Sequence, residues 1–369
     1  MTRHDNINNS VNKCRLVPLS LAGIAKVQEN HAVEVVVLFL GLTAAMLPGM
    51  ARVDTIVALE NMMPSSSEPV DEFNQLRAEG MGRDALAVKV TAANSDEGVQ
   101  DVTSNSSRRY IESLTSKVRD IQGVEAAFSP FRRDGLIDGS RKTAVIIAYG
   151  FVGDSGGEME RIFNKVEEES SYDRPEGVRV EVAGVPAVQQ RLSGMVSRDK
   201  DVTTAISLVL VFFIALGLFR GSLTSALMPL FVVGLSVVWL YGSMGYLGIP
   251  LSTLAGSVAA LVIGIGIDYS VHLLNAYRFH RRDSPTGEAL EETISETGVA
   301  IVATSLTTVS AFLAFLVGEM PEMHRFGITM SLGITYALLF AFFLLPSVFV
   351  LEDRLMHEIR DRLDWRHGM

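Results

Sequence analysis

The chain has 369 residues, of which 48% are hydrophobic and 20% are charged, and this composition excludes an intrinsically disordered chain. Its one cysteine, Cys14, excludes a disulfide scaffold, a cysteine-based zinc site and an iron–sulfur cluster. The formal net charge of -10 argues against nucleic acid as a partner, because nucleic-acid-binding surfaces are usually basic.

Six apolar stretches are long enough, or nearly so, to cross a bilayer, which takes roughly 20 helical residues. They are residues 32–50, 202–219, 223–247, 251–274, 298–317 and 326–351. The first is the weakest, since Glu34 lies near its start and Pro48 near its end. The alternative of a signal peptide is disfavoured because the run is long for one and no small-residue cleavage site follows.

The spacing of these stretches predicts the domain organisation. We expect a cytoplasmic N-terminal segment at residues 1–31, a first transmembrane helix at 32–50 and an extracytoplasmic domain at 51–200. A five-helix transmembrane bundle at 201–351 and a cytoplasmic tail at 352–369 should follow.

Lysine and arginine residues near the membrane predict the orientation. With a cytoplasmic N-terminus, the cytoplasmic segments hold Arg3, Lys13, Arg15, Lys26, Arg220, Arg278, Arg281, Arg282, Arg354, Arg360, Arg362 and Arg366. The opposite short loops hold only Arg325. This bias predicts a multi-pass protein of the plasma membrane with both termini in the cytoplasm.

The residues between the first two spans predict a small α+β domain. Alternating apolar residues indicate strands at 84–91, 124–128, 143–151 and 178–182, and helical spacing indicates helices at 101–121 and 158–170. The order βαββαβ is that of a ferredoxin-like domain, a fold that by itself specifies no activity. After Pro186 an amphipathic segment is predicted to run as a helix into the second span.

The fourth span contains a carboxylate: residues 264–272 read GIGIDYSVH, with Asp268 between apolar residues. A carboxylate at membrane depth costs roughly 2.5–3.5 kcal/mol or more. Protonation lowers this cost, because desolvation favours the neutral acid. A carboxyl that takes up a proton on one side of the membrane and releases it to the other is a proton carrier, so we predict that Asp268 works as one.

Other residues are candidates to assist Asp268. Tyr269 is predicted to donate a hydrogen bond to the carboxylate of a facing helix or protomer. The possible relay partners are His272 and the hydroxyls Thr304, Ser305 and Thr308 of the fifth span. Small residues in the fourth span let another helix approach closely; they are Gly256, Ala260, Gly264 and Gly266.

Simpler interpretations stay open for these residues. Asp268 can bond a neighbouring hydroxyl and merely hold the bundle together, and His272 can be an interfacial polar residue. The hydroxyls can satisfy carbonyls of their own helix, and the glycines can serve packing alone. No metal-ligand set and no nucleophile–base pair occurs in the outside domain, so we predict no metal, no cofactor and no enzymatic activity.

The layout and several motifs resemble the resistance–nodulation–division (RND) superfamily, and most of all its MMPL-like branch of hydrophobe exporters. The matching stretches are GIGIDYSVHLL at 264–274, LENMMPSSSEPV at 59–70, GVP at 184–186, RD at 198–199, ATSLTTVSAFLAF at 303–315, RFG at 325–327 and LP at 345–346. The resemblance implies that Asp268 and Tyr269 form the proton relay. It also implies that the outside domain is a porter domain that gathers hydrophobic substrates.

Typical members of that superfamily carry two such repeats and twelve helices, whereas this chain has one repeat. The resemblance therefore implies a half-size transporter that assembles as a homodimer or homotrimer in membrane lipid, driven by protons and carrying hydrophobic or lipid-like substrates. Two alternatives are kept: an auxiliary factor of protein translocation like SecD or SecF, and a lipid- or sterol-sensing membrane module.

Overall fold

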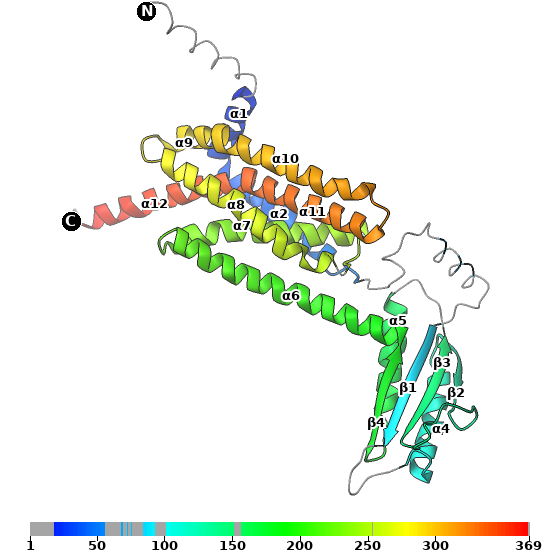
Figure 1. The fold of residues 1–369 in the computed structure, drawn as a ribbon. Coiled ribbons are helices and arrows are strands. Elements are labelled where there is room, and N and C mark those ends of the chain that lie inside the picture. Colours follow the sequence, from blue (N-terminus) through cyan, green and yellow to red (C-terminus); the bar gives the residue numbers. More distant parts are fainter. Residues whose placement is uncertain are drawn as a thin grey trace, which may run out of the picture. The chain divides into compact units, whose positions relative to one another are not determined.

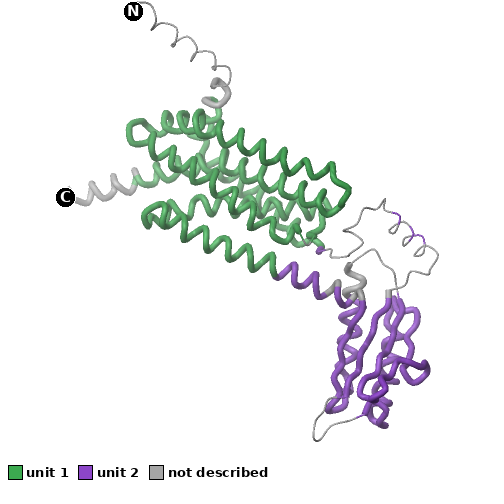
Figure 2. The backbone as a smooth tube through the Cα atoms, in the orientation of Figure 1, with its two compact units in different colours: residues 1–54, 199–369 green, residues 55–198 purple. Residues whose placement is uncertain are grey.

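The computed structural model describes residues 18–55, 84–92, 101–150, 156–252 and 254–367, together with Glu68, Glu72 and Gln75. The chain divides into two compact units, coloured in Figure 2: unit 1 is Met1–Asp54 with Asp199–Met369, and unit 2 is Thr55–Arg198. The motif predicted at 59–70 lies outside the described residues, apart from Glu68.

The described residues of unit 2 form an antiparallel sheet, the helices α4 and α5, and the first part of α6 (Val185–Leu218) (Figure 1). Its elements are β1 (Asp84–Ala92), α4 (Asn105–Arg119), β2 (Val124–Phe128), β3 (Thr143–Gly150), α5 (Gly156–Ser171) and β4 (Val178–Gly184). The strand order is β2-β3-β1-β4, and Val88 of β1 pairs with Ile146 of β3 and Val182 of β4. The strands therefore lie where the alternating pattern predicted them.

The core of unit 2 forms between the two helices and one face of the sheet. Val88 and Ile146 point from the sheet toward Ile111 of α4 and Val166 of α5, and all four are fully buried. Helix α4 begins at Ser104, whose hydroxyl accepts a hydrogen bond from the backbone N–H of Ser107.

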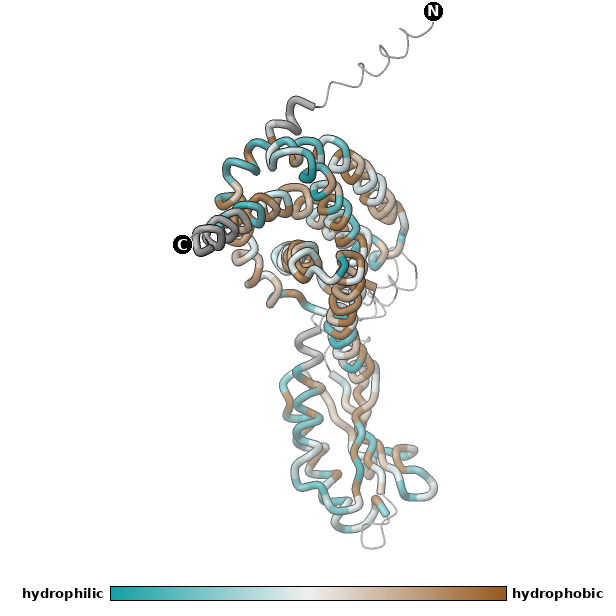
Figure 3. Tube along the Cα trace, turned by 90° about the vertical axis from the view of Figure 1, so that its left-hand side faces the viewer, coloured by the Kyte–Doolittle hydropathy of each residue, from teal (hydrophilic) through white to brown (hydrophobic). Residues whose placement is uncertain are grey.

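Unit 1 is helical, and Figure 3 shows hydrophobic residues along much of its helices. Its elements are α1 (Pro18–Asn30), α2 (Ala32–Met50), the second part of α6 (Val185–Leu218), α7 (Leu223–Leu247), the 3-10 turn η3 (Ala255–Ser257), α8 (Val258–His280), α9 (Thr286–Thr293), the π-helical turn η4 (Ile294–Gly298), α10 (Val299–Leu313), the 3-10 turn η5 (Ala314–Val317), α11 (Pro321–Leu339), the π-helical turn η6 (Phe340–Leu344) and α12 (Leu345–His367).

Six helical segments of the described chain are long and apolar enough to cross a membrane. They are Ala32–Met50, Arg191–Leu218, Leu223–Leu247, Ala255–His280, Thr286–Val317 and Pro321–Met356. Each overlaps one of the predicted apolar stretches, and α6 is continuous from Val185, as expected from the segment after Pro186. The fifth segment is longer than its apolar run, because the polar helix α9 continues through η4 into α10.

Helices α2 and α7 cross through glycines. A Cβ on Gly242 would lie 2.7 Å from Cβ of Met46, and a Cβ on Gly245 would overlap with the carbonyl oxygen of Gly49. Such small residues let two membrane helices approach backbone to backbone, which increases their van der Waals contact. The sequence analysis did not identify this crossing.

An aromatic cluster continues the same interface. The ring of Trp239 in α7 stacks on Phe39 of α2 at 5.9 Å and meets Phe340 of η6 edge-on at 5.0 Å. The Trp239 indole N–H donates to the Thr43 hydroxyl at 2.9 Å, and the Tyr336 and Ser243 hydroxyls are 2.7 Å apart. These contacts join α2, α7 and α11 into one packed body.

We predict that Gly245→Ala weakens this crossing. The added methyl group collides with backbone that belongs to a neighbouring helix, so the free energy of unfolding should fall by about 1–3 kcal/mol and the melting temperature in detergent should drop by several degrees. Gly234→Ala, on the same helix, is the matched control, since nothing among the described residues lies within 4 Å of its Cβ position. Equal melting temperatures for the two variants would contradict the crossing.

Candidate functional site

Helix α8, which carries the predicted relay motif, presents a tightly packed inner face. This face lies against α7 and α11. A Cβ on Gly266 would lie 3.0 Å from Cβ of Ala337, and a Cβ on Gly333 would overlap with the Val262 side chain. Gly266 is thus a packing residue between α8 and α11, and there is no room for a larger side chain at this position.

The opposite face of α8 is exposed and carries the stripe residues Leu261, Gly264, Asp268, His272 and Asn275. Their spacing of three or four residues places them along one side of the helix. Among the described residues, nothing lies within 4 Å of the Cβ position of Gly264. This face is therefore open in a single chain.

The predicted row of small residues passes from the inside of unit 1 to this stripe. Gly256 is buried, Ala260 is half-buried, and Gly264 and Asp268 are exposed. A row of residues four apart drifts around a helix because the α-helical repeat is 3.6 residues. The drift brings the carboxylate out of the bundle and onto the stripe.

Asp268 occupies the middle of a membrane-spanning segment. The segment Ala255–His280 has 26 residues, so Asp268 lies roughly 18–20 Å from either end at 1.5 Å per residue. In the described part of the chain, the ion pairs at the C-terminal end of α8 belong to Arg278, His280 and the following Arg281, and none involves Asp268. The sequence analysis placed this carboxylate at membrane depth without identifying the face it takes.

Tyr269 points into the bundle rather than toward a facing protomer. Its side chain is 7% exposed, and Ser305 of α10, whose hydroxyl donates to the carbonyl of Ile301 at 2.7 Å, lies near its hydroxyl. Consecutive residues of a helix are about 100° apart, so Tyr269 cannot share the direction of Asp268. The bond from Tyr269 to a carboxylate of a facing helix or protomer stays a prediction.

The other candidate hydroxyls bond within their own helix. The Thr304 hydroxyl donates to the Ile301 carbonyl at 3.0 Å, and the Thr308 hydroxyl donates to the Thr304 carbonyl at 2.8 Å. These bonds correspond to the simpler interpretation that the sequence left open for this helix. His272 lies one turn from Asp268 on the same exposed face.

A second polar cluster ties the C-terminal end of α8 to α9 and α12. One carboxylate oxygen of Asp353 accepts hydrogen bonds from the Tyr277 hydroxyl at 2.6 Å, the Arg281 Nε at 2.8 Å and the Thr286 hydroxyl at 3.2 Å. The bond to Asp353 raises the pKa of the Arg281 guanidinium above its ordinary value. This cluster fixes the end of the helix that carries Asp268.

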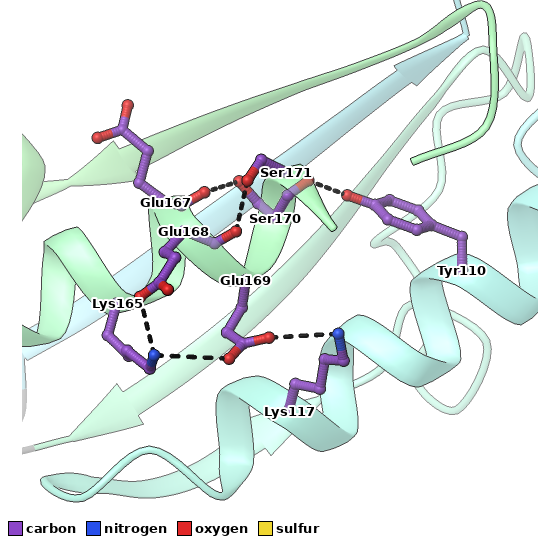
Figure 4. A network of polar contacts seen from close by, with 8 residues as sticks. All are labelled: Tyr110, Lys117, Lys165, Glu167, Glu168, Glu169, Ser170 and Ser171. Atoms are coloured by element: carbon purple, nitrogen blue, oxygen red, sulfur yellow. Dashed lines mark hydrogen bonds and ion pairs between the residues drawn. The ribbon is translucent and has the colours of Figure 1, made fainter. Parts of the chain in front are cut away.

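Unit 2 has a shallow pocket of about 370 Å³ between α4 and α5. Lys117 forms an ion pair with Glu169 at 3.2 Å, and the Tyr110 hydroxyl donates to the Ser170 carbonyl (Figure 4). Lys117 also lies over the Tyr172 ring. Because these groups pair with one another, we assign the network a structural role. Among the described residues, no three His, Cys, Asp or Glu side chains are grouped to hold a metal ion.

We predict that Tyr110→Phe loosens α4 and α5. The change leaves the buried Ser170 carbonyl without its donor, which costs about 1–3 kcal/mol, and hydrogen exchange of residues 105–119 and 156–171 should accelerate. Tyr172→Phe is the control, because Tyr172 is 54% exposed.

The same tyrosine makes unit 2 sensitive to alkali. Burial raises the pKa of Tyr110 to about 12, whereas an unfolded tyrosine ionises near pH 10. The folded state therefore keeps a proton that the unfolded state loses, and stability falls as the pH rises from about 10 to about 12. The measurement is the hydrogen-exchange rate of residues 105–119 as a function of pH. If this rate rises equally at alkaline pH in the wild type and in Tyr110→Phe, Tyr110 is not the cause of the sensitivity to alkali.

Comparison with known proteins places these features in a family. Residues 61–366 match the MMPL family. The chain is 27% identical to a membrane protein of Methanocaldococcus jannaschii, over 89% of this chain and 91% of that protein. It is 26% identical to the apo-petrobactin exporter of Bacillus anthracis, over 53% of this chain and 28% of the exporter. It is 21% identical to the sulfolipid-1 exporter MmpL8 of Mycobacterium tuberculosis, over 87% of this chain and 30% of that protein.

The chain thus spans nearly all of the archaeal relative but less than a third of either exporter. The family match covers both the α8 motif and most of unit 2, and the six apolar helices make the protein a multi-pass membrane protein. The chain belongs to the MMPL family, whose named relatives include transport proteins and lipid exporters.

Proposed function

We propose that this protein is an exporter of hydrophobic or lipid-like molecules, driven by the proton-motive force in the plasma membrane, with both termini in the cytoplasm. In this proposal Asp268 binds and releases the proton. Unit 2 is a porter domain outside the membrane, and the single repeat assembles as a homo-oligomer.

The observation that carries the proposal is the position of Asp268. It lies at mid-span on the open face of α8, and none of the ion pairs in the described part of the chain includes it. A lone carboxylate there is costly when charged and much cheaper when protonated. Its protonation state and its surroundings are therefore coupled, which is the property that a proton-driven conformational cycle requires.

Tyr269 supplies a mechanical link in this proposal. It follows Asp268 directly, and its hydroxyl reaches Ser305 on α10. A rotation or shift of α8 that accompanies protonation of Asp268 is thereby passed to α10. His272, one turn from Asp268 on the exposed face, is the residue best placed to exchange protons with it.

The arrangement of unit 2 supports the porter role. Read from the β4 edge, its strand order is β4-β1-β3-β2 with both helices packed in one core, which supports our proposal of a ferredoxin-like domain. In the sequence, unit 2 lies between the first candidate span and the other five, which supports a one-plus-five layout. Relatives named as exporters of sulfolipid-1 and apo-petrobactin favour amphipathic or hydrophobic cargo.

The open face of α8 supports self-assembly. A polar stripe at membrane depth must face protein or water rather than lipid. A second copy related by a two-fold axis would lay the same stripe against the first and cover both carboxylates. Because Gly264 has open space around it, the helix can be approached closely at that point.

We predict that Asp268→Asn abolishes gradient-driven export while the protein remains in the membrane, because the amide cannot carry a proton. Lipids released to the outer leaflet and the medium by cells producing each variant are compared by mass spectrometry. Asp268→Glu keeps an acid and should retain part of the export. Glu34→Gln, which removes an exposed acid from another span, is the control.

A companion measurement needs no knowledge of the cargo. Dicyclohexylcarbodiimide modifies protonated carboxyls in apolar surroundings, so it should label Asp268 in the wild type, less as the pH rises, and should not label Asp268→Asn there. Export at the native rate by Asp268→Asn would rule out the relay. A translocation factor or a lipid sensor would instead leave the released lipids unchanged.

We also predict that the α8 stripe lies at a subunit interface. In a Cys14→Ser background, Gly264→Cys should form disulfide-linked dimers in native membranes, since two copies of the open stripe meet there. Leu38→Cys, at an exposed position of α2, is the control and should cross-link far less. Equal cross-linking at both positions, or a chain that transports as a monomer, would contradict the assembly.

A further inference from the structure

Two of the membrane-spanning segments contain a π-helical turn, and the two turns touch. Turn η4 precedes α10 and turn η6 precedes α12. A Cβ on Gly298, the last residue of η4, would lie 2.9 Å from the ring of Phe342 in η6. A π-helical turn shifts the backbone hydrogen bonds from i→i+4 to i→i+5 and weakens the helix locally; such turns are frequent at functional sites.

Proline makes the break in η6 more severe. In α-helical register the carbonyl of Phe342 would accept from the N–H of residue 346, but Pro346 has none. The side chain of Gln28 in α1 supplies the missing donor: its Nε2 donates to the Phe342 carbonyl at 2.9 Å and to the Phe343 carbonyl at 3.4 Å. Gln28 is 2% exposed, so this bond is shielded from water.

Two further contacts hold α1 at this place. The Arg354 guanidinium of α12 donates a hydrogen bond to the carbonyl of Glu29. Gly287 of α9 lies against the Glu29 side chain, since a Cβ added to Gly287 would be 2.8 Å from the Glu29 Cδ. Helix α1 therefore contacts α9, η4 and α12 together. It spans the region where both membrane-spanning helices are broken.

The docking of α1 is finely balanced. The Gln28 Oε1 is buried and has no hydrogen-bond partner among the described residues. A buried acceptor left unpaired opposes docking by an amount similar to what a hydrogen bond contributes. Ala25 and Gln28 are each 2% exposed, whereas Val27 between them is 54% exposed, so only one side of this part of α1 is buried. A helix that buries an unpaired acceptor opens more readily than a fully paired core.

We infer that α1 is a latch on the two π-helical turns. When it is docked, Gln28 caps the carbonyl freed by Pro346 and keeps η4 and η6 together. When it undocks, the Phe342 carbonyl loses its donor and the cytoplasmic parts of α10 and α12 are free to move relative to each other. The latch does not depend on the identity of the cargo or on the proposed proton coupling.

The first test is a double-mutant cycle on the full chain in lipid nanodiscs, with peptide-level hydrogen exchange as the readout. Gln28→Leu should raise the exchange of residues 23–30 about tenfold. In a Pro346→Ala background, residue 346 has an N–H that can pair with the Phe342 carbonyl. The same Gln28→Leu change should then raise exchange less than about twofold. Val27→Ala is the control and should have little effect.

Equal effects of Gln28→Leu in both backgrounds would show that Gln28 only packs, and would overturn the capping role. The second test addresses undocking itself. In a Cys14→Ser background, Glu29→Cys with Gly287→Cys places two thiols where α1 meets α9. Their disulfide should slow exchange of α1 about tenfold, and a reductant should reverse this. No change on cross-linking would mean that α1 never undocks, which would overturn the latch.

Discussion

The structure depends on where a charged group can lie in a membrane. The inner face of α8 is filled by contacts such as Gly266 against Ala337 and Gly333 against Val262, so it has no space for a solvated carboxylate. Asp268 therefore lies on the outer face, at mid-span. A carboxylate in that position must be covered by protein, reached by water or neutralised by a proton. In each of these three cases, the charge of the Asp268 carboxylate depends on how the surrounding protein is arranged.

The bundle around α8 contains a tightly packed region, at the crossing of α2 and α7, and a less regular region, at the turns η4 and η6. The glycine crossing of α2 and α7 and the ring cluster around Trp239 hold helices at backbone distance. The turns η4 and η6 interrupt two other membrane-spanning segments, and carbonyls of η6 accept hydrogen bonds from a side chain of α1. Because packed cores resist gradual deformation, we expect movement to concentrate at the breaks.

Much of the fold is visible in the sequence because its signals are local. Apolar runs predicted all six spans, and alternation predicted the four strands, since each pattern reflects burial of one short segment. The apolar stretch 298–317 does not reveal that the helix itself begins at Thr286, because α9 is polar yet continuous with α10 through η4. The motif at 264–272 identified Asp268 from its unusual surroundings alone.

The direction in which each side chain points depends on how the neighbouring helices pack, and one sequence does not show that packing. Tyr269 is buried near Ser305 and does not share the exposed face of Asp268, because of how α8 packs against the bundle. The π-helical turns have no hydrophobic signature. Gln28 carried no signal in the sequence, and it lies opposite the Phe342 carbonyl, more than 300 residues away in sequence. Pairings of this kind cannot be inferred from one sequence.

The most direct measurement of the central claim is an infrared difference spectrum of the reconstituted protein between high and low pH. The account predicts a carboxylic-acid band that appears on acidification in the wild type, is absent in Asp268→Asn and persists, shifted, in Asp268→Glu. Identical spectra for the wild type and Asp268→Asn would mean that this carboxyl does not change its protonation, and would contradict the proton relay.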